Sequence, residues 1–276
     1  MTLPSEPQPS IYVRRIGEGP RKLFALHCTI AHSGVWSGLA AALSQKVCTT
    51  APDMLSHGRS PDWDGQGDYF DLVSRLSAAE LPEPTDVIGH SFGAMIALRL
   101  AIEHPERIRS LVLIEPVFFA IAKQDAHAAF DQHERDASPI AAAFAAGDKT
   151  LAARLFNRMW STQNSAKWSD LPERTRASMV RGIDAVPAVH AALYDDAFGL
   201  LAPETLKRAS MPILLLSGSE SHPVMPAICN GLKQRLPDAT HTKVLGAGHM
   251  LPISHPFETA VLLDEFWESR SPLKAD

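Results

Sequence analysis

A sharp turn from a strand into a helix is indicated by the run Asp86-Val87-Ile88-Gly89-His90-Ser91-Phe92-Gly93. A short apolar segment leads directly into G-x-S-x-G, and a long apolar segment follows the motif. The motif alone also occurs by chance, so its flanks give it weight. At such a turn the serine takes a strained conformation, and only glycine-sized neighbours two residues away avoid a clash. Ser91 would then project beside the first amides of the helix, whose partial positive charge suits a developing oxyanion.

Alternating strands and helices extend outward from this turn in both directions. The turn at residues 17–20 predicts a hairpin between the first two strands. The continuous aliphatic runs are typical of strands covered by helices on both faces of a parallel sheet. The predicted strands are 12–16, 22–27, 47–51, 87–89, 110–114, 213–217 and 242–245. The predicted helices are 35–43, 70–79, 94–103 and 256–270.

Between the strands at 110–114 and 213–217 lies a long stretch that is rich in alanine and in helical spacing. We interpret residues 117–208 as a helical lid inserted into a core domain formed by residues 1–116 and 209–276. The fold class predicted for the chain is therefore α/β, with a doubly wound, mostly parallel sheet and a helical lid.

Composition narrows the possible partners. The chain has 276 residues with 26 basic and 31 acidic side chains, and no like-charge run suggests binding to nucleic acid or to a membrane surface. A small-molecule substrate, neutral or anionic, is favoured instead. Residues 1–10 lack the features of a signal peptide and no segment is apolar enough to span a membrane, which predicts a cytoplasmic protein. Oligomeric state is not indicated.

The sequence predicts no cofactor and no metal site. Cys28, Cys48 and Cys229 form no C-x-x-C motif, which argues against a disulfide framework and a zinc site. The chain also contains no H-E-x-x-H motif, P-loop or dinucleotide-binding fingerprint.

A serine hydroxyl needs a base to act as a nucleophile at neutral pH, and a histidine held by a carboxylate is the usual solution. Of the twelve histidines, His249 is the best candidate. It follows the last predicted strand within Gly246-Ala247-Gly248-His249-Met250, where glycines allow the loop to bend over the carboxyl edge of the sheet. The chain order of serine before histidine agrees with this choice.

These motifs resemble those of lid-bearing serine hydrolases of the α/β-hydrolase fold superfamily, over nearly the whole chain. The segment from Leu26 to Thr29 resembles the family's H-G-x loop, Pro52 to Ser60 its D-x-x-G-x-G-x-S segment, and Gly248-His249 its histidine loop. The resemblance implies an oxyanion hole formed by the backbone amides of Phe92 and Thr29. Cys28 and Ser56 stand where the family has glycine. A thiol nucleophile at Cys28 is a distant alternative.

The acid of the triad is left open between two residues. The family commonly has an aspartate about three residues after the glycine that ends the penultimate strand, but here that position is Ser221. Glu220 lies in the same loop, and Glu115 follows the strand at 110–114, where some relatives carry their acid. We prefer Glu115, because burying a carboxylate at the end of an apolar strand costs free energy, and a role in the triad would explain why one stands there.

The leading functional hypothesis is hydrolysis of a small ester, thioester or lactone through an acyl-serine intermediate, with Ser91, His249 and Glu115 as the triad. Two alternatives are a carbon–carbon bond hydrolase acting on a diketone-like substrate and a non-catalytic receptor for a small ligand. A pocket is expected between lid and sheet, with Met250 in contact with the substrate. The candidates for its apolar lining are Trp160, Trp168, Phe118, Phe119 and Met159.

Overall fold

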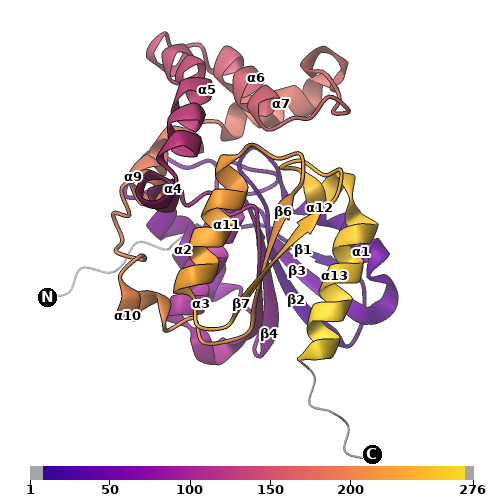
Figure 1. Ribbon diagram of the computed structural model, residues 1–276. Helices are drawn as coiled ribbons and strands as arrows, with labels where there is room; N and C mark the ends of the chain where they lie inside the picture. The colour runs from indigo at the N-terminus through magenta and orange to yellow at the C-terminus, as the bar shows by residue number, and fades with distance from the viewer. Residues whose placement is uncertain (1–8, 271–276) are drawn as a thin grey trace, which may run out of the picture.

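The computed structural model describes residues 9–270, which contain a single seven-stranded sheet (Figure 1). The strand order is β1-β3-β2-β4-β5-β6-β7, with β1 antiparallel to β3 and the other pairs parallel. The strands are β1 (Val13–Ile16), β2 (Arg21–Leu26), β3 (Val47–Pro52), β4 (Thr85–His90), β5 (Ile108–Ile114), β6 (Ile213–Gly218) and β7 (Ala239–Val244). Because the strands run parallel, the loops that follow β2 to β7 gather at one edge of the sheet.

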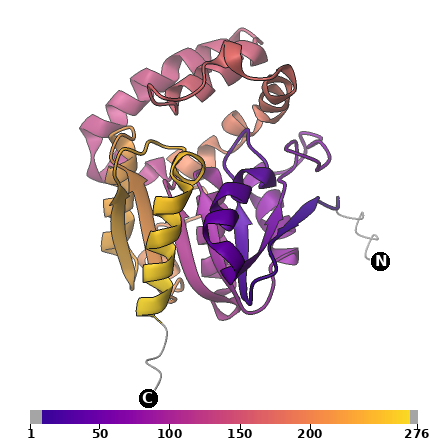
Figure 2. The same ribbon diagram turned by 90° about the vertical axis from the view of Figure 1, so that its right-hand side faces the viewer.

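Helices cover both faces of the sheet (Figures 1 and 2). One face packs on α1 (Ser37–Ala42) and α13 (Pro256–Ser269). The other packs on α2 (Tyr69–Ala79), α3 (Phe92–Glu103) and α11 (Val224–Arg235). Successive residues of β2 alternate between the two apolar clusters, as the pleat of a strand requires. The predicted fold class is thus confirmed for the α/β architecture and its mostly parallel sheet.

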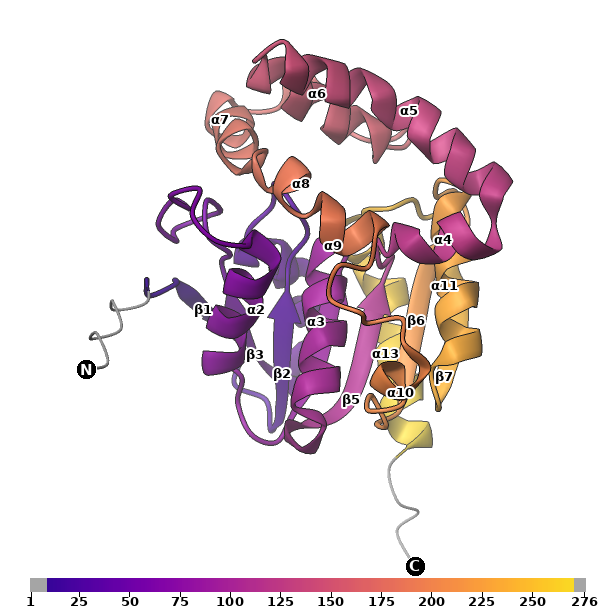
Figure 3. The same cartoon turned by 90° about the vertical axis from the view of Figure 1, so that its left-hand side faces the viewer.

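The segment between β5 and β6 is helical. It contains α4 (Phe119–Asp125), α5 (His127–Ala145), α6 (Lys149–Met159), α7 (Glu173–Gly182), α8 (Ala185–Ala188), α9 (His190–Tyr194) and α10 (Pro203–Leu206). Figure 3 shows α5, α6 and α7 arching over the edge of the sheet where the parallel strands end. These three helices share a small apolar cluster that also includes Ile30 of the loop after β2, whereas α4 belongs to the main core. The division into a core and a lid stays a prediction.

Two details of the predicted fold are wrong. β1 does not form a hairpin with β2 but pairs with β3, which lies between them. The turn after β1 crosses the end of β3, where the amide of Gly19 donates to the carbonyl of Val47. The short connection between β1 and β2 therefore predicted the turn correctly but not the strand that pairs with β1. The last strand begins at Ala239 rather than at residue 242, because its polar first half lies half-exposed at the sheet edge and lacks an apolar signature.

Within residues 9–270, no helix is both long and apolar enough to cross a membrane. The same residues contain no group of three or more His, Cys, Asp or Glu side chains placed to hold a metal ion. A further helix, α12 (Leu251–Ser254), immediately follows the predicted histidine loop. The cytoplasmic location stays a prediction.

Candidate active site

Ser91 lies at the turn between β4 and α3, and its backbone is strained. Its φ of 56° and ψ of −118° are unusual for a residue with a side chain. A Cβ atom at Gly89 would collide with the carbonyl of Gly93, and one at Gly93 would collide with the carbonyl of Leu26. The amide of Ser91 donates to the carbonyl of Ile114 at 2.9 Å and so fixes the turn to β5. The geometry of this turn is the one that the sequence predicts.

Glu115 and His249 meet at the same edge of the sheet although 134 positions separate them. Nδ1 of His249 lies 3.1 Å from Oε2 of Glu115, and both side chains are buried. The other carboxyl oxygen, Oε1, accepts a hydrogen bond of 2.7 Å from the amide of Gly218. Glu115 has a φ of 49°, so its backbone is also held in the left-handed region. The pair is therefore anchored by β5, by β6 and by the loop after β7.

Burial controls the protonation of this pair. Desolvation raises the pKa of Glu115 to about 8, although the hydrogen bond from the Gly218 amide opposes this shift. Desolvation also lowers the pKa of His249 to about 3. Burial therefore opposes a lone charge on either group. A charge that forms on the imidazole in this buried site would depend on the neighbouring carboxylate for stabilisation.

The competing carboxylate, Glu220, is exposed, and it makes no ion pair with any residue in the described part of the chain. Its backbone amide donates to the carbonyl of Ala247 at 2.9 Å, so its loop does support the loop that carries His249. Of the two carboxylates left open by the sequence, the structure brings Glu115 into contact with His249.

His90 is a buried neighbour that the sequence interpretation missed. Its Nε2–H group donates to the backbone carbonyl of His249 at 2.8 Å, which holds the histidine loop against the end of β4. The ring of Trp160 lies 4.4 Å from the ring of His249, centroid to centroid. The only sequence signal for the contact between His90 and the His249 carbonyl was the position of a histidine directly before the serine. Nothing in the sequence placed Trp160 beside this particular ring.

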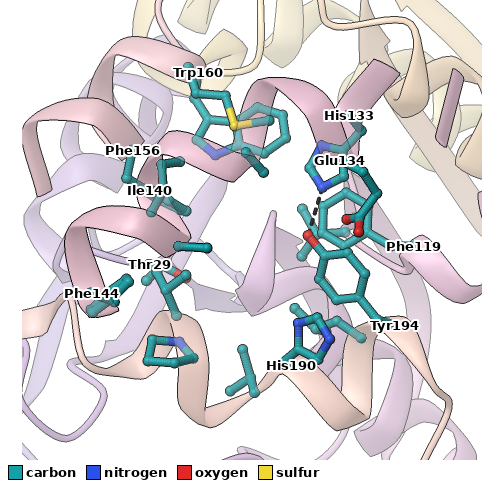
Figure 4. A pocket seen from close by; sticks show the side chains of 18 of the residues that line it. Thr29, Phe119, His133, Glu134, Ile140, Phe144, Phe156, Trp160, His190 and Tyr194 are labelled. Atoms are coloured by element: carbon teal, nitrogen blue, oxygen red, sulfur yellow. Dashed lines mark hydrogen bonds between the residues drawn. The ribbon is translucent and has the colours of Figure 1, made fainter. Parts of the chain in front are cut away.

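A cavity of about 570 Å³ lies between the sheet edge and the helical segment (Figure 4). Ser91 and Thr29 both line it, together with Trp160. Most of the other lining side chains are apolar: Val117, Phe119, Ala137, Ile140, Ala141, Phe144, Phe156, Met159, Val186, Pro187, Val189 and Leu193. The cavity therefore joins the serine and the expected oxyanion loop to an apolar chamber.

Of the six expected pocket residues, Phe119, Met159 and Trp160 line the cavity, and Phe118, Trp168 and Met250 do not. Phe118 is fully buried in the main core, and the next residue, Phe119, lines the cavity instead. Phe118 is the N-cap of α4 and Phe119 its first residue. Met250 caps α12 outside the lining.

The polar side chains of the cavity lie mainly on α5 and α9. Figure 4 shows His133 and Tyr194 joined by a hydrogen bond, which measures 2.6 Å, across from Thr29. Glu134 and His190 lie beside them and are exposed. Among the described residues that line the cavity, none is Lys or Arg. A negatively charged group inside the cavity would therefore have no cationic side chain to pair with.

Two buried histidines hold the loop that contains Thr29. The amide of Ile30 donates to Nε2 of His57, and the amide of Met54 donates to Nε2 of His27, each at 3.0 Å. Cys28 is only 4% exposed, and burial raises the pKa of its thiol to about 12, which disfavours a reactive thiolate.

Ser56, which stands where the resembled family has glycine, takes a φ of 62°. Its hydroxyl accepts a hydrogen bond of 2.9 Å from the amide of Trp63. The loop thus keeps a left-handed conformation despite the side chain.

A strained serine at a strand–helix turn, on a mostly parallel sheet wrapped by helices, defines the α/β-hydrolase class of proteins. The sequence profile of the Alpha/beta hydrolase family matches residues 23–261, and the chain belongs to this family. The family membership indicated by the motifs is confirmed, and with it the assignment to enzymes of the carboxylic ester hydrolase class.

Among curated proteins, the chain is similar to the pimeloyl-[acyl-carrier protein] methyl ester esterase of Nitrosomonas europaea, with 29% identity over 90% of this chain and 95% of that protein. The enzyme of the same name from Aeromonas hydrophila subsp. hydrophila is 28% identical over 93% of this chain and 99% of that protein. Among solved structures, the enol-lactonase of Burkholderia xenovorans LB400 has a TM-score of 0.69 at 18% identity, over 94% of this chain and 96% of that chain. That structural likeness supports the fold.

Proposed function

We propose that the protein hydrolyses a carboxylic ester through an acyl-serine intermediate, with Ser91 as nucleophile, His249 as general base and Glu115 as the acid that orients His249. The contact between His249 and Glu115, at the sheet edge that also presents the strained Ser91, carries this proposal. Ser91 Oγ attacks the ester carbonyl while His249 takes its proton and then returns it to the leaving alcohol. Water, activated by the same histidine, releases the acid and restores the serine.

The amides of Phe92 and Thr29 are the proposed oxyanion hole. Phe92 is the first residue of α3, so its amide lies at the positive end of a helix and has no intrahelical acceptor. Thr29 lines the same cavity as Ser91. A donor of this kind typically contributes about 10²- to 10³-fold to kcat.

The proposed substrate class is an ester, thioester or lactone with a neutral, apolar acyl group. The cavity is large enough for a small-molecule acyl chain and its lining is mostly apolar. Relatives named methyl ester esterases support ester hydrolysis. The helical segment over the sheet edge would act as a lid that keeps water away from the acyl group.

The lining of the cavity disfavours the carbon–carbon alternative. Cleavage of a carbon–carbon bond leaves its electron pair on carbon as an enolate, and a positive charge near this anion would stabilise it. The described lining residues include no Lys or Arg side chain that could do so. An alkoxide or thiolate leaving group needs only the proton that His249 carries.

Labelling with a fluorophosphonate probe tests the nucleophile and the receptor alternative together. We expect one probe per chain, attached to Ser91, because His249 as general base would activate this hydroxyl. Ser91→Ala should not be labelled. Intact mass spectrometry followed by peptide mapping gives the answer. A folded wild-type protein that stays unlabelled would support a non-catalytic receptor and reject the proposed function.

Discrimination against a charged acyl group tests the substrate class. We expect p-nitrophenyl hexanoate to be hydrolysed with kcat/KM about 100-fold higher than mono-p-nitrophenyl adipate, which has a similar acyl length but ends in a carboxylate. The adipate carboxylate would be desolvated in an apolar cavity without a cationic partner, and this costs on the order of several kcal/mol of free energy. The release of p-nitrophenol at pH 7.5 measures both rates. Equal rates would contradict a neutral acyl site.

A further inference from the structure

A second cavity, of about 460 Å³, lies apart from Ser91, between α7 and the loop that follows β3. Arg14 of β1, Arg59 of that loop and Arg174 of α7 all line it. Figure 3 shows α7 above the loops at the β1 side of the sheet. The cavity thus collects three guanidinium groups from three segments, in a protein whose formal net charge is −5. General basicity of the chain does not account for this cluster.

Within residues 9–270, none of these three arginines forms an ion pair with a carboxylate. Nε of Arg14 donates to the Ser33 hydroxyl at 3.1 Å, and Nη1 of Arg59 donates to the Tyr12 hydroxyl at 3.2 Å. Arg174 is exposed and makes no hydrogen bond with another described residue. Most donor positions of the three groups are therefore free for a ligand.

Two of these guanidinium groups lie against the same tyrosine. The guanidinium carbons of Arg14 and Arg59 lie 5.9 and 4.3 Å from the centre of the same Tyr12 ring. The ring attracts both cations but does not cancel their mutual repulsion. An anion in the cavity that both groups line would offset that repulsion.

The one carboxylate of this lining, Asp53, is already engaged. Its Oδ1 accepts from the amide of Ser33 at 2.6 Å, and its Oδ2 accepts from the amide of Arg59 at 2.8 Å. Asp53 is 1% exposed, and these two hydrogen bonds hold the loop after β3 against the loop after β2. It therefore does not occupy the outward donors of the guanidinium groups.

We propose that this cavity binds a phosphoryl group. A tetrahedral phosphate presents oxygens to several guanidinium groups at once, whereas a carboxylate presents two. The hydroxyls of Thr175 and Ser178 also line the cavity and add two donors. The volume exceeds what a phosphate needs, so the phosphoryl group can be free or borne by an organic molecule. Because Arg174 belongs to α7, the bound group joins the helical segment to the sheet domain.

Calorimetric titration of the full-length protein with inorganic phosphate, against sodium chloride of equal ionic strength, tests this site. We expect saturable binding of one phosphate per chain, together with a rise in Tm that chloride does not produce. Arg59→Gln and Arg174→Gln should each weaken phosphate binding at least about tenfold, because each removes a charge-assisted contact. Arg176→Gln, on the same helix but outside the cavity, should change the affinity less than about twofold.

Titrations with other ligands distinguish free phosphate from an organic phosphate ester and from other anions. Tighter binding of glycerol 3-phosphate or adenosine monophosphate than of phosphate supports an organic phosphate ester, and equal binding supports free phosphate. Acetate binding as tight as that of phosphate would overturn the assignment. So would unchanged affinity in Arg174→Gln, a variant whose exposed side chain is not needed for folding. Protein labelled at Ser91 should still bind phosphate, so this test is independent of the proposed function. If the labelled protein no longer bound phosphate, the phosphate site would be the cavity at Ser91 and this proposal would be wrong.

Discussion

Glu115→Gln is expected to lower kcat for an aryl ester about 10⁴-fold, with little change in KM. The imidazolium of His249 forms during the reaction in a site where burial opposes charge. A glutamine keeps the size of the side chain but supplies no negative charge. Because the Gly218 amide still finds an acceptor in the glutamine carbonyl, the fold should persist. Steady-state kinetics with p-nitrophenyl hexanoate, alongside the circular dichroism spectrum, measure both effects.

Two further variants serve as controls for Glu115→Gln. Glu220→Gln changes the other candidate acid in the same way, and we expect its kcat to stay within about twofold of the wild type, because the side chain is exposed. Glu115→Asp retains the charge on a shorter side chain and should be more active than Glu115→Gln. If Glu220→Gln were inactive and Glu115→Gln active, the assignment of the acid would be reversed.

The sequence predicts best what local backbone geometry dictates. The elbow at Ser91 can be identified because the strand–helix turn leaves no room for a side chain at Gly89, which faces the carbonyl of Gly93, or at Gly93, which faces the carbonyl of Leu26 on β2. The G-x-S-x-G spacing records both requirements. The loop around Thr29 and the position of His249 follow from motifs of the same short range. In each case the signal lies within the segment that adopts the structure.

What depends on contacts between distant segments could not be predicted from the sequence. Glu115 and Glu220 both follow strands at the same edge, and only the folded loops decide which one reaches His249. Phe118 and Phe119 are identical in type, and the turn into α4 alone decides which one lines the cavity. Helix α11 was not anticipated, although it packs its apolar face on the sheet.

Acid is expected to unfold the protein near pH 5, because five of the described histidines are buried in their neutral form, four of them at the carboxyl edge of the sheet. Burial lowers the pKa of His27 to about 4 and the pKa values of His57 and His249 to about 3. Burial also lowers the pKa of His90 well below its ordinary value. Above pH 6.5 these groups are neutral in both the folded and the unfolded chain, so they do not affect stability there. As the pH falls toward the folded-state values, only the unfolded chain binds the protons, and stability is lost.

The size of this loss is comparable with the stability of a whole domain. At pH 5, a buried histidine with a folded-state pKa near 3 costs about 2 kcal/mol of unfolding free energy relative to neutral pH. Four such groups cost roughly 6–8 kcal/mol, against a typical total of about 5–15 kcal/mol. Glu115 opposes the trend, since its raised pKa makes the folded chain bind an extra proton between its ordinary value and about pH 8. One carboxyl cannot offset four imidazoles.

Urea unfolding at a series of pH values between 7 and 5, at constant ionic strength, measures the slope of stability with pH. We expect His57→Gln to reduce this slope by about 1.4 kcal/mol per pH unit below pH 6, because one titrating group is removed. Glutamine can still accept from the Ile30 amide and donate to the Leu55 carbonyl, as His57 does. His127→Gln, at an exposed position of α5, should leave the slope unchanged. A flat wild-type slope between pH 6.5 and 5 would mean that these histidines acquire protons without unfolding, and that burial does not keep them neutral.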